Sequence, residues 1–280
     1  MKRSLVIAAD KSGSGKTTLT CGLIYVIKKM GFKVQSFKCG PDYIDPMFHR
    51  EVLGVPSANI DSFFVSEKML RKLFAERAGK ADVSVIEGVM GYYDGLGGVS
   101  VKGSTWEIAD IIGSPTVLVM DCKGASVSIA ALIRGMLEFP GYIAGKHDSG
   151  IRGVILNRVS PMFYERLKGL IEENCPEIRV LGFIPEMKDR KIPSRHLGLI
   201  EPKDMEDFTS WIETVSEQIE KTVDVEGILE LAATSKYGES ADSWISEYGE
   251  RDLTSESCKS GNDQSCSGEA LVVEDKSIAI

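Results

Sequence analysis

The feature that most constrains this chain is a glycine-rich stretch near its N-terminus, residues 10–18, with the sequence DKSGSGKTT. It follows the apolar run of residues 5–9 and precedes a helical pattern that begins at Leu19. A strand, a glycine loop and a helix in this order form a phosphate-binding loop, because backbone N–H groups and the positive end of the helix face an anion. Asp10 replaces the first glycine of the motif G-x-x-x-x-G-K-[ST], but the flanking pattern supports the interpretation.

The residue types in this loop match the chemistry of nucleotide binding. Glycines let N–H groups converge on phosphate, the Lys16 amine reaches the terminal phosphates, and the Thr17 hydroxyl can ligate Mg2+. We therefore predict ATP and Mg2+ as cofactors. The predicted nucleotide-binding residues of the loop are Ser12, Gly13, Ser14, Gly15, Lys16, Thr17 and Thr18.

Strands and helices alternate along residues 1–233. Strands are expected at 5–9, 33–39, 82–87, 115–121, 151–157 and 178–184, and helices at 19–30, 66–78, 104–112, 125–137, 161–174, 204–221 and 225–233. A loop is expected from 138 to 150, because Pro140 lies in it. This alternation predicts an α/β fold with a doubly wound, mostly parallel sheet of the P-loop NTPase type.

The composition excludes several classes of partner. A net charge of -8 argues against a nucleic-acid surface, which needs clustered lysine and arginine. No apolar run approaches the roughly 20 residues that cross a bilayer, and no signal-like segment opens the chain, so we expect a cytoplasmic protein. The six cysteines show no C-x-x-C spacing, which favours reduced thiols over a metal site or disulfides.

Acidic residues follow two of the predicted strands. Asp42 and Asp45 lie in a predicted polar loop, within the string GPDYIDP, and Glu87 ends a buried strand. The carboxyl ends of parallel strands share one edge of a sheet, and Mg2+ prefers hard oxygen ligands. We predict Thr17, Asp42 and Glu87 as metal ligands. The alternative is that Asp42 and Asp45 only cap a turn, and Asp121, at the end of another strand, competes with Glu87.

Other polar features are less specific. Loop 88–98 is rich in glycine and contains Asp94, so it could bend over a substrate or be a plain connection. Asn157 ends a strand, where a side-chain amide can contact adenine. A basic stretch at 188–196 could meet substrate carboxylates or could be a solvated loop. His49 and His147 lack a partner pattern, and we interpret them as structural or surface residues.

Four blocks closely resemble the cobyrinic acid a,c-diamide synthases of cobalamin biosynthesis. They are residues 12–18, KCGPDYIDP at 38–46, EGVMGYYDG at 87–95 and RHLGL at 195–199. GPDYIDP is the most specific block, because phosphate loops are widespread and this string is not. The family's synthetase domain resembles dethiobiotin synthetase and is normally followed by a linker and a glutamine amidotransferase domain. The resemblance implies a synthetase domain at 1–233, a flexible linker at 234–275 and the first strand of an amidotransferase domain at 276–280.

The resemblance also implies a reaction. Mg-ATP phosphorylates a peripheral carboxylate of the tetrapyrrole, and ammonia from glutamine then displaces phosphate to form the amide, at one acetate and then the other. The implied partners are a corrinoid polycarboxylate and a glutamine amidotransferase domain or another ammonia source, and a homodimer stays open. The implied catalytic residues are Lys16, Asp42, Asp45, Glu87 and Asp94, and Tyr43 and Ile44 are the implied contacts to the macrocycle.

The sequence leaves two alternatives open. Lys11 occupies the position of the signature lysine of dimeric partition and cell-division ATPases, which would make the chain a nucleotide switch. Related ligases amidate hydrogenobyrinic acid or a nickel tetrapyrrole. The GPDYIDP string favours the ligase. Because we place Asp45 in a polar loop, we expect Asp45→Asn to abolish amidation with little effect on stability.

Overall fold

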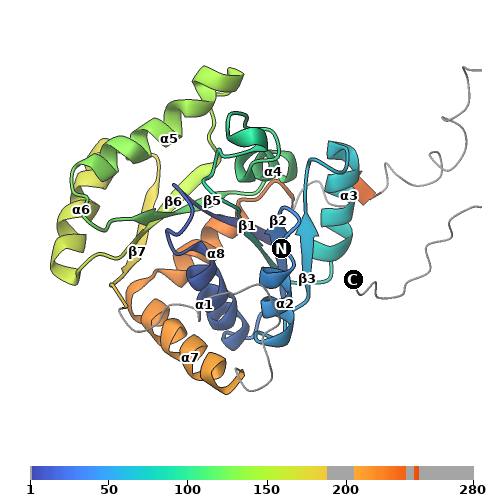
Figure 1. Ribbon diagram of the computed structural model, residues 1–280, viewed down its shortest axis with the longest axis horizontal. Coiled ribbons are helices and arrows are strands. Elements are labelled where there is room, and N and C mark those ends of the chain that lie inside the picture. The colour runs from blue at the N-terminus through green and yellow to red at the C-terminus, as the bar shows by residue number, and fades with distance from the viewer. Residues whose placement is uncertain (1, 188–204, 238–242, 246–280) are drawn as a thin grey trace, which may run out of the picture. The chain divides into compact units, whose positions relative to one another are not determined.

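A computed structural model of the 280-residue chain describes residues 2–187, 205–237 and 243–245. All pairs of neighbouring strands are parallel, and they form one sheet in the order β3-β2-β4-β1-β5-β6-β7 (Figure 1). The strands are β1 (Arg3–Ala9), β2 (Val34–Cys39), β3 (Ser57–Ile60), β4 (Val83–Glu87), β5 (Thr116–Asp121), β6 (Ile151–Asn157) and β7 (Arg179–Ile184). The predicted α/β class with a doubly wound parallel sheet is confirmed.

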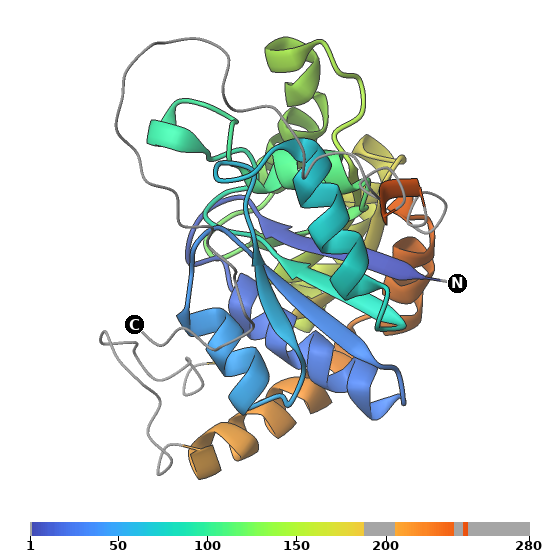
Figure 2. The same cartoon turned by 90° about the vertical axis from the view of Figure 1, so that its right-hand side faces the viewer.

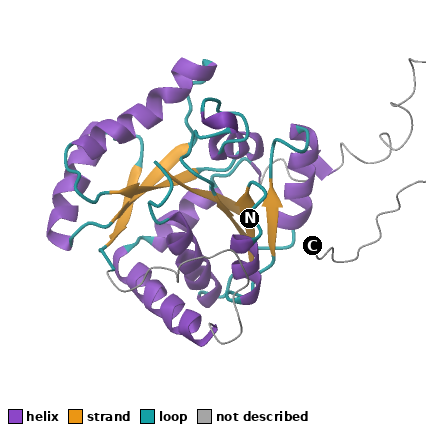
Figure 3. Ribbon diagram, in the orientation of Figure 1, coloured by secondary structure: helices purple, strands orange, loops and turns teal. Residues whose placement is uncertain are grey.

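Helices cover both faces of the sheet (Figure 3). One face carries α1 (Lys16–Lys29), α2 (Ile44–Glu51), α7 (Met205–Thr222) and α8 (Val225–Ala233). The other carries α3 (Glu67–Ala78), α4 (Thr105–Ile112), α5 (Ser128–Ala144) and α6 (Pro161–Asn174). Side chains of one strand alternate between the two cores: Leu5 and Ile7 pack toward α1, and Val6 and Ala8 pack toward α3 and α4. Figure 2 shows α1 (blue) and α7 (orange) side by side.

Three elements differ from the predictions. The four-residue edge strand β3 was not predicted, and α2 begins inside the stretch that we expected to be a loop. The predicted end of the helix near residue 137 was wrong, because α5 continues through Pro140 to Ala144. Pro140 has no N–H to donate to the Met136 carbonyl, and the Tyr93 hydroxyl donates to that carbonyl at 2.5 Å instead. The Pro140 carbonyl accepts from Gly145 and Lys146.

Packing continues past Ala233 into the predicted linker. Ser235 and Ser4 form a buried hydroxyl hydrogen bond of 2.5 Å, and the buried Tyr237 ring packs edge-on against Phe74. The basic stretch, the RHLGL block, most of the predicted linker and residues 276–280 lie outside the described residues. Within the described part of the chain, no helix has both the length and the apolar content to cross a bilayer.

Candidate functional site

The predicted phosphate loop joins β1 to α1 at the carboxyl edge of the sheet. Gly15 precedes the first turn of α1 with a φ of 97°, which favours glycine. A Cβ at Gly15 would lie 2.3 Å from Asn157 Nδ2, so the close approach of β6 requires glycine as well. The Asn157 amide donates to the Ser14 carbonyl at 2.8 Å, and Arg158 donates to the Gly13 carbonyl at 2.9 Å. The end of β6 therefore holds the loop in place.

A cavity of about 790 Å³ opens beside this loop. The loop residues Gly13, Lys16 and Thr18 line it, together with Asn157 and Arg158. Its volume is in the range of small-molecule sites, and N–H groups at a helix N-terminus suit phosphate. Asn157 borders the cavity, but its amide also supports the loop backbone, a role that the strand-tip argument did not predict.

Lys16 bridges the phosphate loop and the loop after β4. Its amine donates to the Met90 carbonyl and, at 3.4 Å, to the Lys11 carbonyl. Burial and the positive charge of Lys38 lower the pKa of Lys16 below its ordinary value. Met90 has a φ of 50°, an uncommon conformation for a residue with a side chain. The predicted phosphate-contacting lysine thus lies against the glycine-rich loop.

Glu87, and not Asp121, lies beside the Thr17 hydroxyl. Thr17 Oγ1 donates to Glu87 Oε1 at 2.6 Å. The Asp121 carboxylate instead lies 2.7 Å from Arg158 Nη2 and 3.5 Å from Lys11 Nζ. The sequence left Glu87 and Asp121 as alternative acids at the phosphate site. Of the two, only Glu87 contacts Thr17.

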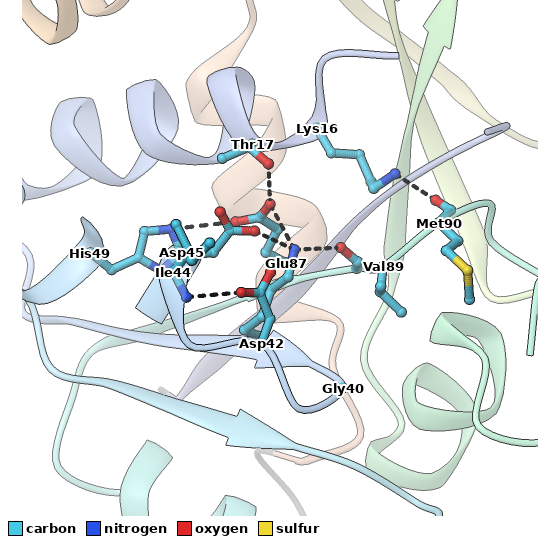
Figure 4. Close-up of polar contacts among 12 residues, drawn as sticks. Lys16, Thr17, Gly40, Asp42, Ile44, Asp45, His49, Glu87, Val89 and Met90 are labelled. Carbon is cyan, nitrogen blue, oxygen red and sulfur yellow. Dashed lines mark hydrogen bonds and ion pairs between the residues drawn. The ribbon is translucent and has the colours of Figure 1, made fainter. Parts of the chain in front are cut away.

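A buried ion cluster joins β2, α2 and β4 at this edge (Figure 4). Lys38 Nζ lies 2.7 Å from Asp45 Oδ2 and 3.0 Å from Glu87 Oε1, and it also donates to the Gly88 carbonyl. Asp45 is 2 % exposed, so our prediction that it lies in a polar loop outside the core was wrong. The physical reason is that α2 starts at Ile44 and turns Asp45 inward, toward a lysine that requires an anion.

The charged groups of this cluster stabilise one another's ionised forms. Burial alone would lower the pKa of Lys38, but the Glu87 and Asp45 carboxylates outweigh it and raise that pKa above its ordinary value. Burial alone would raise the pKa of Glu87, but the Lys38 ammonium outweighs it, with His49 and the Thr17 hydroxyl adding to the effect. The pKa of Glu87 is therefore well below its usual range. Both groups are charged at neutral pH.

His49 lies behind Glu87 and is fully buried. Its Nε2 is 3.3 Å from Glu87 Oε2, and its Nδ1 is 2.7 Å from the Ser36 hydroxyl. Sequence reasoning missed the roles of Lys38 and His49. A signal existed for Lys38, because a lysine inside a buried strand is rare unless it is paired. No pattern in the sequence connects His49 to Glu87, since α2 brings them together.

The remaining predicted residues lie around the cluster. The Asp42 carboxylate accepts from the Ile44 N–H at 2.9 Å, and Asp94 accepts from the Gly91 N–H at 2.8 Å, so each shapes its own loop. Tyr43 is 80 % exposed and Ile44 is partly exposed. Ser12 is exposed at the tip of the phosphate loop.

The donor set at Thr17 and Glu87 fits Mg2+. Both offer hard oxygen atoms, and these lie 2.6 Å apart at the start of α1. Among the described residues no three His, Cys, Asp or Glu side chains gather as a metal cluster. The Asp42 carboxylate is engaged by its own turn, so Thr17 and Glu87 are the better-supported ligands.

Curated relatives resemble most of the chain. Cobyrinate a,c-diamide synthase of Clostridium tetani is 41% identical over 229 residues, which are 82% of this chain and 50% of that protein. The Priestia megaterium protein of the same name is 41% identical over 235 residues, 84% of this chain and 50% of that protein. The Salmonella typhimurium protein of the same name is 40% identical over 234 residues, which are 83% of this chain and 49% of that protein. The chain thus spans about half the length of the curated relatives it matches.

A family model covers the site and most of the sheet. The model described as CobQ/CobB/MinD/ParA nucleotide binding domain matches residues 5–200. Among solved structures, the MinC:MinD cell division protein complex of Aquifex aeolicus is 17% identical to this chain, with a TM-score of 0.48. The match covers 81% of this chain and 95% of that chain, and a likeness this distant does not bear on function. The family match includes the phosphate loop, the GPDYIDP string and Glu87. The chain therefore belongs to the CbiA family of CobQ/CobB/MinD/ParA nucleotide binding domains.

Proposed function

We propose that this chain carries the ATP-dependent step in amidation of the a and c acetate carboxylates of cobyrinic acid. The names of relatives about 40% identical over most of the chain support the substrate. The observation that carries the chemistry is the buried cluster in which Lys38 lies between Asp45 and Glu87, with Glu87 bonded to the residue after Lys16. This places fixed charges of both signs beside a phosphate loop.

The proposed reaction has two steps. An oxygen of the ring carboxylate forms a bond to the terminal phosphorus of ATP, and the bond from phosphorus to the ADP oxygen breaks. The nitrogen of ammonia then attacks the acyl carbon, loses a proton to form the amide, and phosphate leaves with the former carboxylate oxygen.

In the first step the carboxylate of the ring must approach the terminal phosphate of ATP, and both are anions. The protein therefore contributes positioned positive charge that stabilises this approach. The Lys16 amine would bind the terminal phosphate, and its hydrogen bond to the Met90 carbonyl would break. Mg2+, held by Thr17 and Glu87, would supply further positive charge at the phosphates. Lys38 and His49 hold the Glu87 carboxylate in one orientation. We also propose that ammonia comes from a glutamine amidotransferase domain, or from free ammonia when the chain acts alone.

The test is phosphate release from Mg-ATP by this chain in ammonium chloride, with and without cobyrinic acid, followed by mass spectrometry of the ring. The proposal predicts ring-dependent phosphate release and a product in which hydroxyl is exchanged for amine. Hydrogenobyrinic acid in parallel reports whether the central metal matters. Slow hydrolysis that ignores the ring, but rises with self-association or a protein partner, would favour the nucleotide switch instead.

A further inference from the structure

The Glu87 oxygen that Thr17 does not contact lies against His49 (Figure 4). Glu87 Oε1 accepts from the Thr17 hydroxyl at 2.6 Å and from Lys38 Nζ at 3.0 Å. Glu87 Oε2 lies 3.3 Å from His49 Nε2, and both side chains are fully buried. Within the described ranges, neither Oε2 nor Nε2 forms a hydrogen bond with a third residue. Each of these buried atoms therefore depends on the other for a polar contact.

Two serine hydroxyls face the other nitrogen of the His49 ring. Ser36 and Ser57 lie opposite each other in the register of β2 and β3. The Ser36 hydroxyl lies 2.7 Å from His49 Nδ1, a normal hydrogen-bond length, whereas the Ser57 hydroxyl lies 3.5 Å away. Ser36 is therefore the main partner of Nδ1.

The Ser36 contact determines which nitrogen of His49 carries the hydrogen. In a neutral imidazole one nitrogen donates and the other accepts, and the partner of one nitrogen sets the role of the other. When the Ser36 hydroxyl donates to Nδ1, the ring hydrogen is on Nε2, beside Glu87. An ionised carboxylate can only accept, so this is the tautomer that Glu87 requires.

The contact at Oε2 fixes the orientation of the whole Glu87 carboxylate. The terminal torsion of a glutamate side chain is broad, so the group turns easily unless both oxygens are bound. Thr17 and Lys38 both contact Oε1, and His49 contacts Oε2. Groups behind a metal-binding side chain orient it, and their loss typically lowers metal affinity about 10- to 100-fold. His49 therefore controls how Oε1 is presented beside the Thr17 hydroxyl.

A purely structural role for His49 predicts a different dependence. If the buried ring only filled space between α2 and the sheet, its loss would disturb nucleotide binding and metal binding alike. If the ring orients Glu87, its loss affects the metal first, because Lys16 and the backbone of the phosphate loop face the nucleotide phosphates. The two roles are therefore separated by measuring the two affinities independently.

We propose that His49 is a positioning residue of the Mg2+ site. The Ser36 hydroxyl directs the ring hydrogen to Nε2, and Nε2 holds Glu87 so that its other oxygen faces Thr17 and the metal. The inference rests on the proposed Mg-ATP-dependent reaction and extends its site from Glu87 to the two residues behind it. It requires that metal affinity depend on His49 and Ser36, while affinity for metal-free nucleotide does not.

The first test compares His49→Asn with His49→Gln. The asparagine amide reaches the place of Nδ1 and the glutamine amide reaches the place of Nε2, so only His49→Gln keeps a donor beside Glu87. Mn2+ takes the same oxygen ligands as Mg2+ and is titrated into the full chain with a non-hydrolysable ATP analogue, with free Mn2+ followed by electron paramagnetic resonance. We expect His49→Asn to weaken Mn2+ binding about tenfold or more, and His49→Gln about threefold or less.

The second test compares the two serines that face the same nitrogen. Ser36→Ala removes the hydroxyl at 2.7 Å and should weaken Mn2+ binding about threefold, because the tautomer is no longer fixed. Ser57→Ala removes the hydroxyl at 3.5 Å and should leave Mn2+ binding at the wild-type value. Ser36→Ala keeps the ring, so it tests the proposal even if His49→Asn does not fold.

Two further readouts exclude a general defect of the site. Affinity for the ATP analogue in EDTA should be the same in all four variants and in wild type. In the amidation assay, His49→Asn and Ser36→Ala should raise the KM for Mg2+ and leave the KM for the ring unchanged. A loss of analogue affinity in EDTA that parallels the loss of Mn2+ affinity would overturn the proposal, because it would mark a ring that only packs.

Wild-type Mn2+ affinity in both His49→Asn and Ser36→Ala would also overturn the proposal. The Mn2+ titration needs no tetrapyrrole, so its result is independent of the amidation assay. Absence of ring-dependent phosphate release in wild type would refute the proposed amidation, whereas the Mn2+ affinities alone decide the role of His49.

Discussion

At the scale of single residues, Lys38 determines the arrangement of the site. Its ammonium is buried in the sheet, where an unpaired charge would cost several kcal/mol, and the carboxylates of Asp45 and Glu87 offset that cost. Because these three groups come from β2, α2 and β4, they also fix the relative position of those elements. Removing one charge therefore affects both stability and chemistry.

Asp45→Asn tests this coupling. The variant leaves the buried Lys38 ammonium short of one carboxylate, so we expect it to lower the free energy of unfolding by about 3 kcal/mol in addition to impairing amidation. Urea denaturation at neutral pH measures the loss. Asp42→Asn is the matched control, since an asparagine oxygen can still accept from the Ile44 N–H, and its stability should stay within about 0.5 kcal/mol of wild type. Equal stability of the two variants would contradict the coupling.

Glu87→Gln tests the same cluster through pH. The folded pKa of Glu87 lies below the unfolded value of about 4.3, so its ionised form stabilises the fold above that pH, and the contribution is lost as pH falls toward the folded pKa. The variant should be less stable than wild type at pH 7, and the difference should shrink below about pH 4. Urea melts across a pH series measure it. A difference that stays constant with pH would contradict the assignment.

Two lysines in one loop separate the ligase from the switch. Lys16 is buried against Met90, whereas the Lys11 side chain is 59% exposed and pairs with Asp121. We expect Lys16→Ala to weaken ATP binding by about tenfold or more, because it removes the cation at the terminal phosphate. Lys11→Ala should leave ring-dependent turnover near wild type. Titration calorimetry and the amidation assay measure the two effects, and loss of turnover only in Lys11→Ala would support the switch.

At the scale of elements, the contact of α1 with α7 fixes the helix that follows the phosphate loop. A Cβ at Gly22 would lie 2.4 Å from Ile219 and 2.7 Å from Val215, both on α7. We expect Gly22→Ala to destabilise the fold by about 2 kcal/mol through overpacking. Gly169→Ala, in α6 with nothing near its Cβ, should instead add up to about 1 kcal/mol. Thermal melts of both variants show whether each substitution raises or lowers stability. A more stable Gly22→Ala variant would contradict the close contact of α1 with α7.

The elements that the sequence predicted well are those with a local signal in their own residues. Helix α6 has its predicted bounds of 161–174 and Ser160 before its first turn, and β4, with the sequence VSVIE, is buried along its whole length and ends at Glu87. Edge strand β3, with the sequence SANI, is too short to show a period, and its pairing with β2 is what makes it a strand. Helix α2 was hidden because Gly-Pro and Asp-Pro pairs usually mark loops.

At the scale of the whole molecule, the parallel sheet brings distant segments to one edge. The loop after β1 leads to Lys16 at the start of α1, and the ends of β2, β4 and β6 supply Lys38, Glu87 and Asn157. The order of the strands determines which of these residues meet. Sequence could predict the phosphate loop and Glu87, because motif and strand end are local signals. It could not predict that Lys38 pairs with Asp45 or that His49 faces Glu87, because those contacts depend on how α2 packs on the sheet.

The most direct test of the proposed reaction follows one oxygen atom. Cobyrinic acid with a heavy oxygen isotope in its acetate carboxylates is incubated with this chain, Mg-ATP and ammonium chloride, and the inorganic phosphate is analysed by mass spectrometry. If the carboxylate is activated by phosphorylation, one labelled oxygen passes into phosphate for each amide formed. Amide formation with unlabelled phosphate, or labelled carboxylates that return unchanged while ATP is hydrolysed, would contradict the account.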